Sequence, residues 1–338
     1  MSTQKAKAVP VLANESGSGF ELNCVELCDN YNISLDNLQE EIEEKFTEKK
    51  ENSLKLAKVY QYINEFRRSA KVIECGSYLE FRVSSEGQKL QHANFCKDRL
   101  CPMCNWRRSM KIFSQVSSVM DKMQDYEFVF LTLTVKNCKP EDLPKTIQAL
   151  YDGWRYLYHK NSEFRSVIKG TFRSLEVTKN EKTDTFHPHL HCILAVLPSY
   201  FKGKGYITQR KWSLLWGKAC KLEYIPIVHI QKVKPGGKGL KGAVAEASKY
   251  AVKGIDYVNS AKNVRAFLDS LSGRRLCGWT GVFAKIRKDL KLDDAEDGDL
   301  IITDGETIRD DVACMIVRYF WKNGVYCISS VENNCQTT

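Results

Sequence analysis

The sequence lacks long apolar runs and any signal for export. Across 338 residues, no stretch approaches the roughly 18 apolar residues that a membrane span requires. Residues 1–20 carry no positive cluster followed by an apolar run, so neither secretion nor a membrane partner is expected. The 13 cysteines are then expected in a reducing compartment, as thiols or metal ligands, which predicts a cytoplasmic protein. No Gly-x4-Gly-Lys-Ser/Thr loop occurs, so no ATP site is predicted.

Positive charge is concentrated in the middle of the chain. The net charge is +10, and residues 1–20 carry +1, 21–70 carry −4 and 293–338 carry −7, which leaves +20 on residues 71–292. A surplus of this size favours a polyanionic partner such as nucleic acid, although a solvated basic face is the alternative. With 43% hydrophobic residues, the rest of the composition is that of an ordinary globular protein.

The pattern along the chain predicts an α+β protein in five parts. We expect a flexible tail at 1–20, a helical N-terminal segment at 21–70, and a zinc-binding module with a basic helix at 71–125. Residues 126–290 alternate strand-like and helix-like runs and form the main domain, and 291–338 form an acidic connector and a C-terminal hairpin. Apolar residues at helical spacing predict two amphipathic helices within 34–69, at Leu35, Leu38, Ile42 and Phe46, and at Val59, Ile63 and Phe66. Asn323-Gly324 predicts the hairpin turn.

A cysteine cluster predicts a structural zinc site. Cys96, Cys101 and Cys104 lie within nine residues, the last two in a Cys-Pro-Met-Cys turn. Tetrahedral zinc needs four ligands, commonly two from such a turn and two from elsewhere. Cys75 is the first candidate for the fourth ligand and His92 is its competitor. Buried thiols without a metal are the alternative.

The residues directly after this cluster predict a basic helix. Arg107, Arg108 and Lys111 follow Cys104 closely, beside apolar residues at helical spacing. They are candidates for contacting DNA phosphates, or they form a solvated helix face.

Three of the six histidines fall within five positions. Side chains in a strand alternate between faces, so His189 and His191 share one face and are able to hold one metal ion. His187 has the same parity, but Pro188 disturbs the strand there, so His187 is kept as an accessory or DNA-contacting residue. A hairpin turning near Thr183 would place Glu176 opposite His189 or His191, which completes a metal site with open positions.

Residues 242–254 predict a helix that carries a tyrosine. Glu246, Tyr250 and Lys253 fall at i, i+4 and i+7 and so share a helix face, and Gly254 is expected to end the helix. Beside a metal site in a basic chain, Tyr250 is a candidate nucleophile for a phosphodiester, with Glu246 and Lys253 as further catalytic candidates.

These segments resemble a known family. The strand at 129–135, the His-Pro-His-Leu-His run and the Tyr-Ala-Val-Lys segment at 250–253 occur in the order of the three motifs of HUH endonucleases. More narrowly, the chain resembles the rolling-circle replication initiators of small Gram-positive bacterial plasmids. Their likeness extends to the Cys-rich segment at 96–108 and to residues 281–283 and 292–300.

The resemblance implies a nickase domain with a central antiparallel sheet flanked by helices and with Mg²⁺ or Mn²⁺ in its site. It implies nicking of plasmid origin DNA, single-stranded at the nick, through a 5′-phosphotyrosine on Tyr250 that leaves a 3′-hydroxyl primer. Glu246 matches the position of a glutamate that activates water for termination, and Tyr257 is a weaker candidate for a second tyrosine. Host helicase and DNA polymerase are implied partners. The sequence leaves the oligomeric state open, with residues 34–69 and the C-terminal hairpin as candidate interfaces of a homo-oligomer.

Two alternatives stay open at this point. Another HUH enzyme, a conjugative relaxase or a transposase, would share the metal site, but relaxases carry the tyrosine near the N-terminus. A zinc-containing DNA-binding regulator without enzymatic activity would explain the cysteines and the charge. It would leave the His-x-His run and the Tyr250 segment unexplained.

Overall fold

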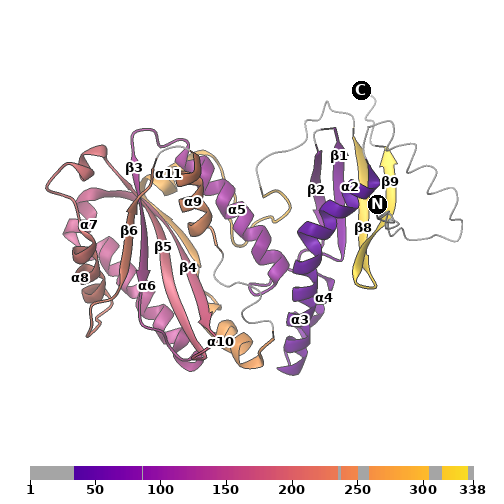
Figure 1. The fold of residues 1–338 in the computed structure, drawn as a ribbon, viewed down its shortest axis with the longest axis horizontal. Coiled ribbons are helices and arrows are strands. Elements are labelled where there is room, and N and C mark those ends of the chain that lie inside the picture. The colour runs from indigo at the N-terminus through magenta and orange to yellow at the C-terminus, as the bar shows by residue number, and fades with distance from the viewer. Residues whose placement is uncertain (1–33, 86, 235–236, 250–258, 304–313, 334–338) are drawn as a thin grey trace, which may run out of the picture. The chain divides into compact units, whose positions relative to one another are not determined.

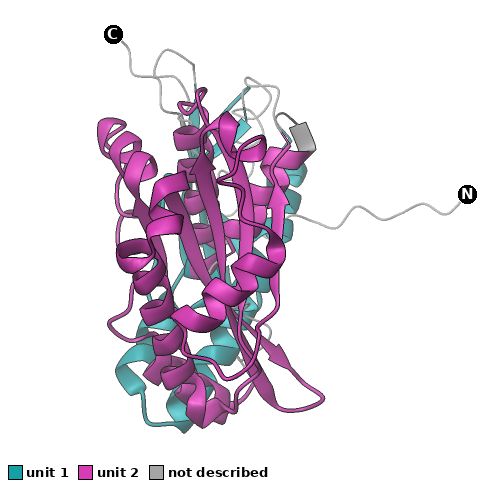
Figure 2. Ribbon diagram, turned by 90° about the vertical axis from the view of Figure 1, so that its left-hand side faces the viewer, with its two compact units in different colours: residues 1–104, 300–338 teal, residues 105–299 magenta. Residues whose placement is uncertain are grey.

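The computed structural model describes residues 34–85, 87–234, 237–249, 259–303 and 314–333. These described residues form two compact units, one within the ranges 1–104 and 300–338 and one within 105–299 (Figure 2). The five-part division expected from the sequence follows the chain, whereas the first unit joins segments from both ends of it. The expected tail at 1–20 lies outside the described residues.

The helices of the first unit differ in part from the expected pair. Helix α2 (Leu35–Ile42) continues through a π-helical turn (Glu43–Thr47) into α3 (Glu48–Tyr62), and α4 spans Phe66–Glu74 (Figure 1). Leu38, Ile42 and Phe46 are buried as expected. Phe66, however, is 62% exposed, because Asn64, with a φ of 64°, turns the chain and starts a new helix with a different inner face.

The first unit also contains an antiparallel sheet of four strands. The strands are β1 (Tyr78–Ser84), β2 (Gly87–Ala93), β8 (Met315–Lys322) and β9 (Val325–Asn333), in the order β2-β1-β8-β9. Asn323 and Gly324, both with positive φ, make the turn between β8 and β9, which confirms the predicted hairpin. The hairpin is not an isolated piece, since β8 pairs with β1 and edge-to-face contacts join Phe81 to Tyr319.

The second unit is built around a five-stranded antiparallel sheet. Its strands are β3 (Glu127–Thr134), β4 (Ile168–Asn180), β5 (Thr185–Val196), β6 (Val228–Lys232) and β7 (Cys277–Thr280), in the order β6-β3-β5-β4-β7. The strand with the histidines, β5, is therefore central, between β3 and β4, and β6 and β7 are the edges. Strand β5 is buried over most of its length, which matches its apolar run after the histidines.

Helices cover both faces of this sheet. The long helix α5 (Pro102–Met120) precedes the sheet in the chain. The other helices of this unit are α6 (Leu143–Lys160), α7 (Ser162–Val167), α8 (Gln209–Ala219), α9 (Gly237–Ala247), α10 (Ala261–Leu271) and α11 (Gly281–Asp289). Short 3-10 turns lie at Pro140–Asp142 and Pro198–Phe201. Helix α6 lies on one face, where Tyr151 stacks under the Arg173 guanidinium of β4. Helix α11 lies on the other face, where Phe283 contacts Phe128 of β3.

The architecture confirms the predicted α+β class, with antiparallel sheets, flanking helices and a helical N-terminal segment. Within the described ranges, no helix combines the length and the apolar character needed to span a membrane.

Candidate functional site

The β4–β5 hairpin brings the three predicted metal ligands together. Glu176 pairs with His189 in the ladder, and Ser174 pairs with His191, so the carboxylate and both imidazoles lie on one face of the sheet. The chain turns at residues 181–184, where Asn180 pairs with Thr185. The predicted hairpin is therefore confirmed, with Glu176 opposite His189.

The ligand atoms of this group converge on one point. His191 Nε2 lies 2.8 Å from Glu176 Oε2, His189 Nε2 lies 3.4 Å from the same oxygen, and the two Nε2 atoms are 3.1 Å apart. Bonds of about 2.1 Å at right angles around a divalent ion would separate neighbouring ligand atoms by about 3.0 Å. The side chains of Glu176, His189 and His191 are buried and fit such an ion.

Neighbouring groups orient both imidazoles toward that point. His189 Nδ1 lies 3.0 Å from the carbonyl oxygen of His187, and His191 Nδ1 lies 3.3 Å from Thr132 Oγ1. A hydrogen bond from Nδ1–H leaves Nε2 as the free ligand atom, which is how metal-binding histidines are commonly held. Phe130 also stacks on the ring of His191 with centroids 5.6 Å apart. The ligands are thus held in place by a second set of contacts.

The environment of Glu176 favours its charged form. Burial alone would raise the pKa of Glu176, but hydrogen bonds with His189 and His191 outweigh that effect and hold the pKa well below its ordinary value. A carboxylate that stays ionised is the form that binds a cation.

His187 lies beside this group without joining it. Its Nδ1 is 2.8 Å from Asn137 Oδ1, and its ring centroid is 5.2 Å from that of His189. Burial lowers the pKa of His187, and its electrostatic interaction with His189 lowers that pKa further. Both roles that the sequence suggested for His187, accessory residue and DNA contact, stay predictions.

Helix α9 carries Glu246 to the edge of the metal group, which is the set formed by Glu176, His189 and His191. Glu246 Oε1 lies 3.7 Å from His191 Nε2, and Lys249 Nζ donates a hydrogen bond to Glu246 Oε2 at 2.5 Å. The helix begins at Gly237 and ends at Ala247, whereas the sequence predicted 242–254. Tyr250 and Lys253 lie outside the described residues, as does Tyr257, so the predicted common helix face stays a prediction.

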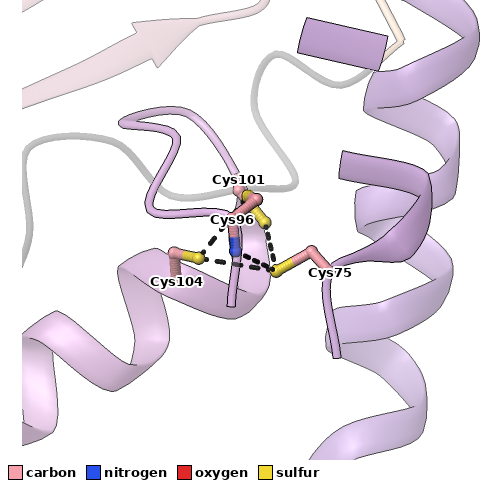
Figure 3. A group of neighbouring side chains, drawn as sticks. All are labelled: Cys75, Cys96, Cys101 and Cys104. Atoms are coloured by element: carbon pink, nitrogen blue, oxygen red, sulfur yellow. Dashed lines mark hydrogen bonds between the residues drawn. The ribbon is translucent and has the colours of Figure 1, made fainter. Parts of the chain in front are cut away.

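The four predicted cysteines meet in the first unit (Figure 3). The Sγ atom of Cys75 lies 3.5 Å from that of Cys104 and 3.6 Å from that of Cys101, and the Sγ atoms of Cys96 and Cys104 are 3.7 Å apart. Four zinc–sulfur bonds of about 2.3 Å in a tetrahedron separate the sulfurs by about 3.8 Å. The donor set and its spacing fit a closed structural zinc site.

The structure brings Cys75, not His92, to the other three cysteines. His92 lies on β2 opposite Glu80, with its Nε2 3.7 Å from Glu80 Oε1 and a largely exposed side chain. Cys75 follows directly after α4, and Gly76, with a φ of 64°, lets the chain turn toward β1.

A buried lysine that the sequence analysis did not identify accompanies the cysteines. Lys50 of α3 is fully buried and donates hydrogen bonds to the carbonyl oxygens of Ile73, at 2.6 Å, and Cys75, at 2.9 Å. Burial lowers the pKa of Lys50, and the nearby Cys75 and Cys101 thiols oppose that effect. A zinc ion with four thiolates carries a charge of −2, so an ammonium ion at this place would offset part of it.

The predicted basic face on α5 is wrong, because all three of its side chains are buried. Arg108 Nε donates to the carbonyl oxygen of Glu296 at 2.9 Å, and Lys111 Nζ pairs with Asp293 Oδ2 at 2.7 Å. The guanidinium of Arg107 lies over the Trp106 ring. Arg108 and Lys111 thus contact acceptors of the second unit.

Residues 293–299, within the predicted acidic connector, form a folded turn that contacts Arg108 and Lys111. The Glu296 carboxylate is buried and accepts hydrogen bonds from the backbone N–H groups of Leu276, at 3.0 Å, and Cys277, at 3.0 Å. Asp294 accepts two further backbone hydrogen bonds within the turn. Charge composition predicted an acidic connector here, but it does not reveal which backbone groups the carboxylates satisfy.

The comparison with protein families gives one match. The family described as "Replication protein" matches residues 87–327, which is more than half of the chain. This range contains three of the four cysteines and the whole β4–β5 hairpin.

Relatives with curated sequences agree with the family match. A "Protein rep" of Streptococcus pneumoniae is 40% identical over 260 residues, covering 74% of this chain and 81% of the relative. A "Protein rep" of a Bacillus species is 42% identical over 261 residues, covering 70% and 84%, and one of Bacillus amyloliquefaciens is 40% identical over 287 residues, covering 77% and 84%. No solved structure was found to match. With most of its length covered by these similarities, the chain belongs to the family of replication proteins.

Proposed function

We propose that the protein initiates rolling-circle replication of a plasmid by nicking one strand of the origin DNA. The observation that carries the proposal is the convergence of Glu176, His189 and His191 on one point of the sheet, next to Glu246 of α9. Two imidazoles and one carboxylate leave positions free for a phosphate oxygen, as catalytic metal sites require. Membership of the replication protein family supplies the biological context.

The proposed reaction is a transfer of a phosphodiester to tyrosine. The phenolic oxygen of Tyr250 attacks the phosphorus, the bond to the deoxyribose 3′-oxygen breaks, and the proton lost by the phenol is balanced by the one that the 3′-oxygen gains. The products are a 5′-phosphotyrosine and a free 3′-hydroxyl that primes a polymerase. Since an ester replaces an ester, the strand can be rejoined without ATP.

Glu176, His189 and His191 would hold the ion that orients the phosphate. When bound, a divalent ion supplies charge that offsets the developing negative charge at phosphorus. Mg²⁺ and Mn²⁺ are the candidates, and the two imidazole ligands favour Mn²⁺ and other transition ions over Mg²⁺. Lys253 is proposed to assist at the phosphate.

Glu246 is proposed to act in termination. Its carboxylate is partly exposed, reaches to 3.7 Å from His191 and precedes Tyr250 by four residues. A carboxylate at this place is suited to accept a proton from water that cleaves the strand at the end of a round. Using water at that step releases the protein.

The proposed partners are plasmid origin DNA, single-stranded at the nick, and the host helicase and polymerase that would extend the primer, all in the cytoplasm. The charge of +20 on residues 71–292 supports the DNA partner. The cysteine cluster is proposed to hold Zn²⁺ as a structural ion.

A nicking assay on supercoiled plasmid that carries the cognate origin tests the proposal. The protein with Mn²⁺ or Mg²⁺ should convert supercoiled DNA into open circles, and chelation with EDTA should stop the reaction. Tyr250→Phe should remove the activity, and Tyr257→Phe, as the matched control, should retain it. Nicking by Tyr250→Phe at the rate of the unchanged protein would contradict the assignment.

A further inference from the structure

A fourth histidine lies on the same face of the sheet as the metal group. Thr132 of β3 pairs with His191 on one side and with His229 of β6 on the other. Directly paired residues in antiparallel strands point to the same face, so His191, Thr132 and His229 form one row across three strands. Two strand spacings separate the backbones of His191 and His229 by about 10 Å.

The side of this row toward β4 is covered. Ser174, the partner of His191 on β4, donates a hydrogen bond from Oγ to the carbonyl oxygen of Ala247 in α9, at 2.6 Å. Farther along the row, the Cys277 thiol lies 3.3 Å from the buried carboxylate of Glu296. Described residues of α9 and of the turn around Glu296 therefore lie over this side of the sheet.

On the side toward β6, the metal face of the sheet carries exposed side chains. His229 is exposed, and so is Gln231, which follows on the same face opposite Phe130. Within the described part of the chain, no hydrogen bond or ion pair involves the imidazole of His229. The metal group itself contains Glu176, His189 and His191 and does not include His229.

The opposite face of β6 is different in character. Lys232 pairs with Glu127 there, and its Nζ also lies 4.3 Å from the centroid of the Phe201 ring. Val228, on the same face, is buried. The exposed imidazole on the metal face is thus not part of the packing that holds this edge strand.

We propose that His229 binds a backbone phosphate of the single strand, next to the phosphate held at the metal group and on the β6 side of it. An imidazole offers an N–H donor in either protonation state, and phosphate oxygens accept such bonds. The contact would fix the position of the strand relative to Tyr250, which is a positioning role toward the substrate. This inference rests on the proposed function and adds a substrate contact to it.

The test uses a short single-stranded oligonucleotide that spans the nick, with single methylphosphonate linkages that remove the charge of one phosphate at a time. Binding is measured by fluorescence anisotropy in the full-length Tyr250→Phe background, so that no cleavage intervenes. His229→Ala should weaken DNA binding about tenfold, because the substitution removes one hydrogen bond to a charged phosphate. In the cleaving protein, the same substitution should raise KM by a similar factor with little change in kcat.

One methylphosphonate near the nick should weaken binding of the parent protein about tenfold but have little further effect on His229→Ala, because the two changes remove the same contact. Lys232→Gln removes a full positive charge from the opposite face of the same strand and should leave the affinity within about twofold. His229→Gln keeps an N–H donor and should recover most of the affinity.

Three results would overturn the inference. The first is that His229→Ala binds the oligonucleotide as tightly as the parent protein. The second is that, at every methylphosphonate position, the fold-loss in DNA affinity multiplies with the fold-loss caused by His229→Ala. The third is that His229→Ala loses affinity for Mn²⁺ and not for DNA. If His229→Ala does not fold, the methylphosphonate scan is carried out on the parent protein and on His229→Gln. That scan then decides whether His229 contacts a phosphate. A protein that binds the origin strand but never cleaves it would refute the proposed function, whereas cleavage without any role for His229 would refute this inference alone.

Discussion

Glu176 and His191 meet across the β4–β5 hairpin with Oε2 and Nε2 2.8 Å apart, although Glu176 pairs in the ladder with His189. One carboxylate oxygen thus faces both imidazoles, which is the arrangement of a shared metal ion. The hairpin register, set by the turn at 181–184, fixes this geometry.

Glu176→Gln should impair metal binding and nicking together, because an amide is a weaker ligand and carries no charge. We expect the Mn²⁺ concentration for half-maximal nicking to rise at least about tenfold. The measurement is the nicking rate as a function of Mn²⁺ concentration. Glu181→Gln, an exchange of the same kind in the turn of the same hairpin, should behave as the parent protein. A normal Mn²⁺ requirement for Glu176→Gln would exclude Glu176 as a ligand.

Cys104→Ser should lose the structural metal. We expect about one Zn²⁺ per chain in the parent protein, measured by atomic absorption after dialysis, and substantially less in the variant. Loss of the ion should also destabilise the first unit, because structural zinc binding contributes directly to folding. His92→Gln should retain the full metal content, since His92 contacts Glu80. Loss of zinc from His92→Gln and not from Cys104→Ser would reverse the assignment.

Glu296→Ala should destabilise the second unit. The substitution leaves two buried backbone N–H groups, of Leu276 and Cys277, without their acceptor. We expect the free energy of unfolding to fall by about 2–4 kcal/mol, measured by urea denaturation. Asp297→Ala, at a mostly exposed position of the same turn, should cost less than about 1 kcal/mol. Equal losses in the two variants would mean that the buried carboxylate has no special role.

Glu246→Ala should separate initiation from termination. Nicking of the origin should continue, while release of the protein at the end of a round should slow, because a carboxylate would no longer accept a proton from water. The measurement compares the nicking rate with the yield of completed circles from a plasmid that carries two origins. Lys249→Ala removes the hydrogen-bond partner of Glu246 and serves as a milder comparison. If Glu246→Ala lost both steps equally, the division of roles would be wrong.

Local patterns predicted the features that depend on neighbouring residues. Strand periodicity predicted that His189 and His191 share one face, and the expected hairpin placed Glu176 on the neighbouring strand across from them. Asn323-Gly324 predicted a second hairpin. A helical period, in contrast, placed Phe66 inside, because nothing in the pattern shows that Asn64 breaks the helix.

Features that depend on distant segments were not predictable in this way. The pairing of β8 with β1 joins residues far apart in the chain, and so do the contacts of Arg108 and Lys111 with the 293–299 turn. A lone histidine such as His229 gives no signal in the sequence, since its place in the site depends on which strand lies beside β3. The family resemblance gave the site residues as a set but not these contacts.

The covalent link between Tyr250 and DNA is the central claim, and a denaturing gel tests it most directly. An origin oligonucleotide labelled at its 3′ end should migrate with the polypeptide after incubation with Mn²⁺, and a tryptic digest should place the label on the peptide that contains Tyr250. Cleavage of the oligonucleotide with no label on the protein would contradict the account, because it would mean that water or another group attacks the phosphate.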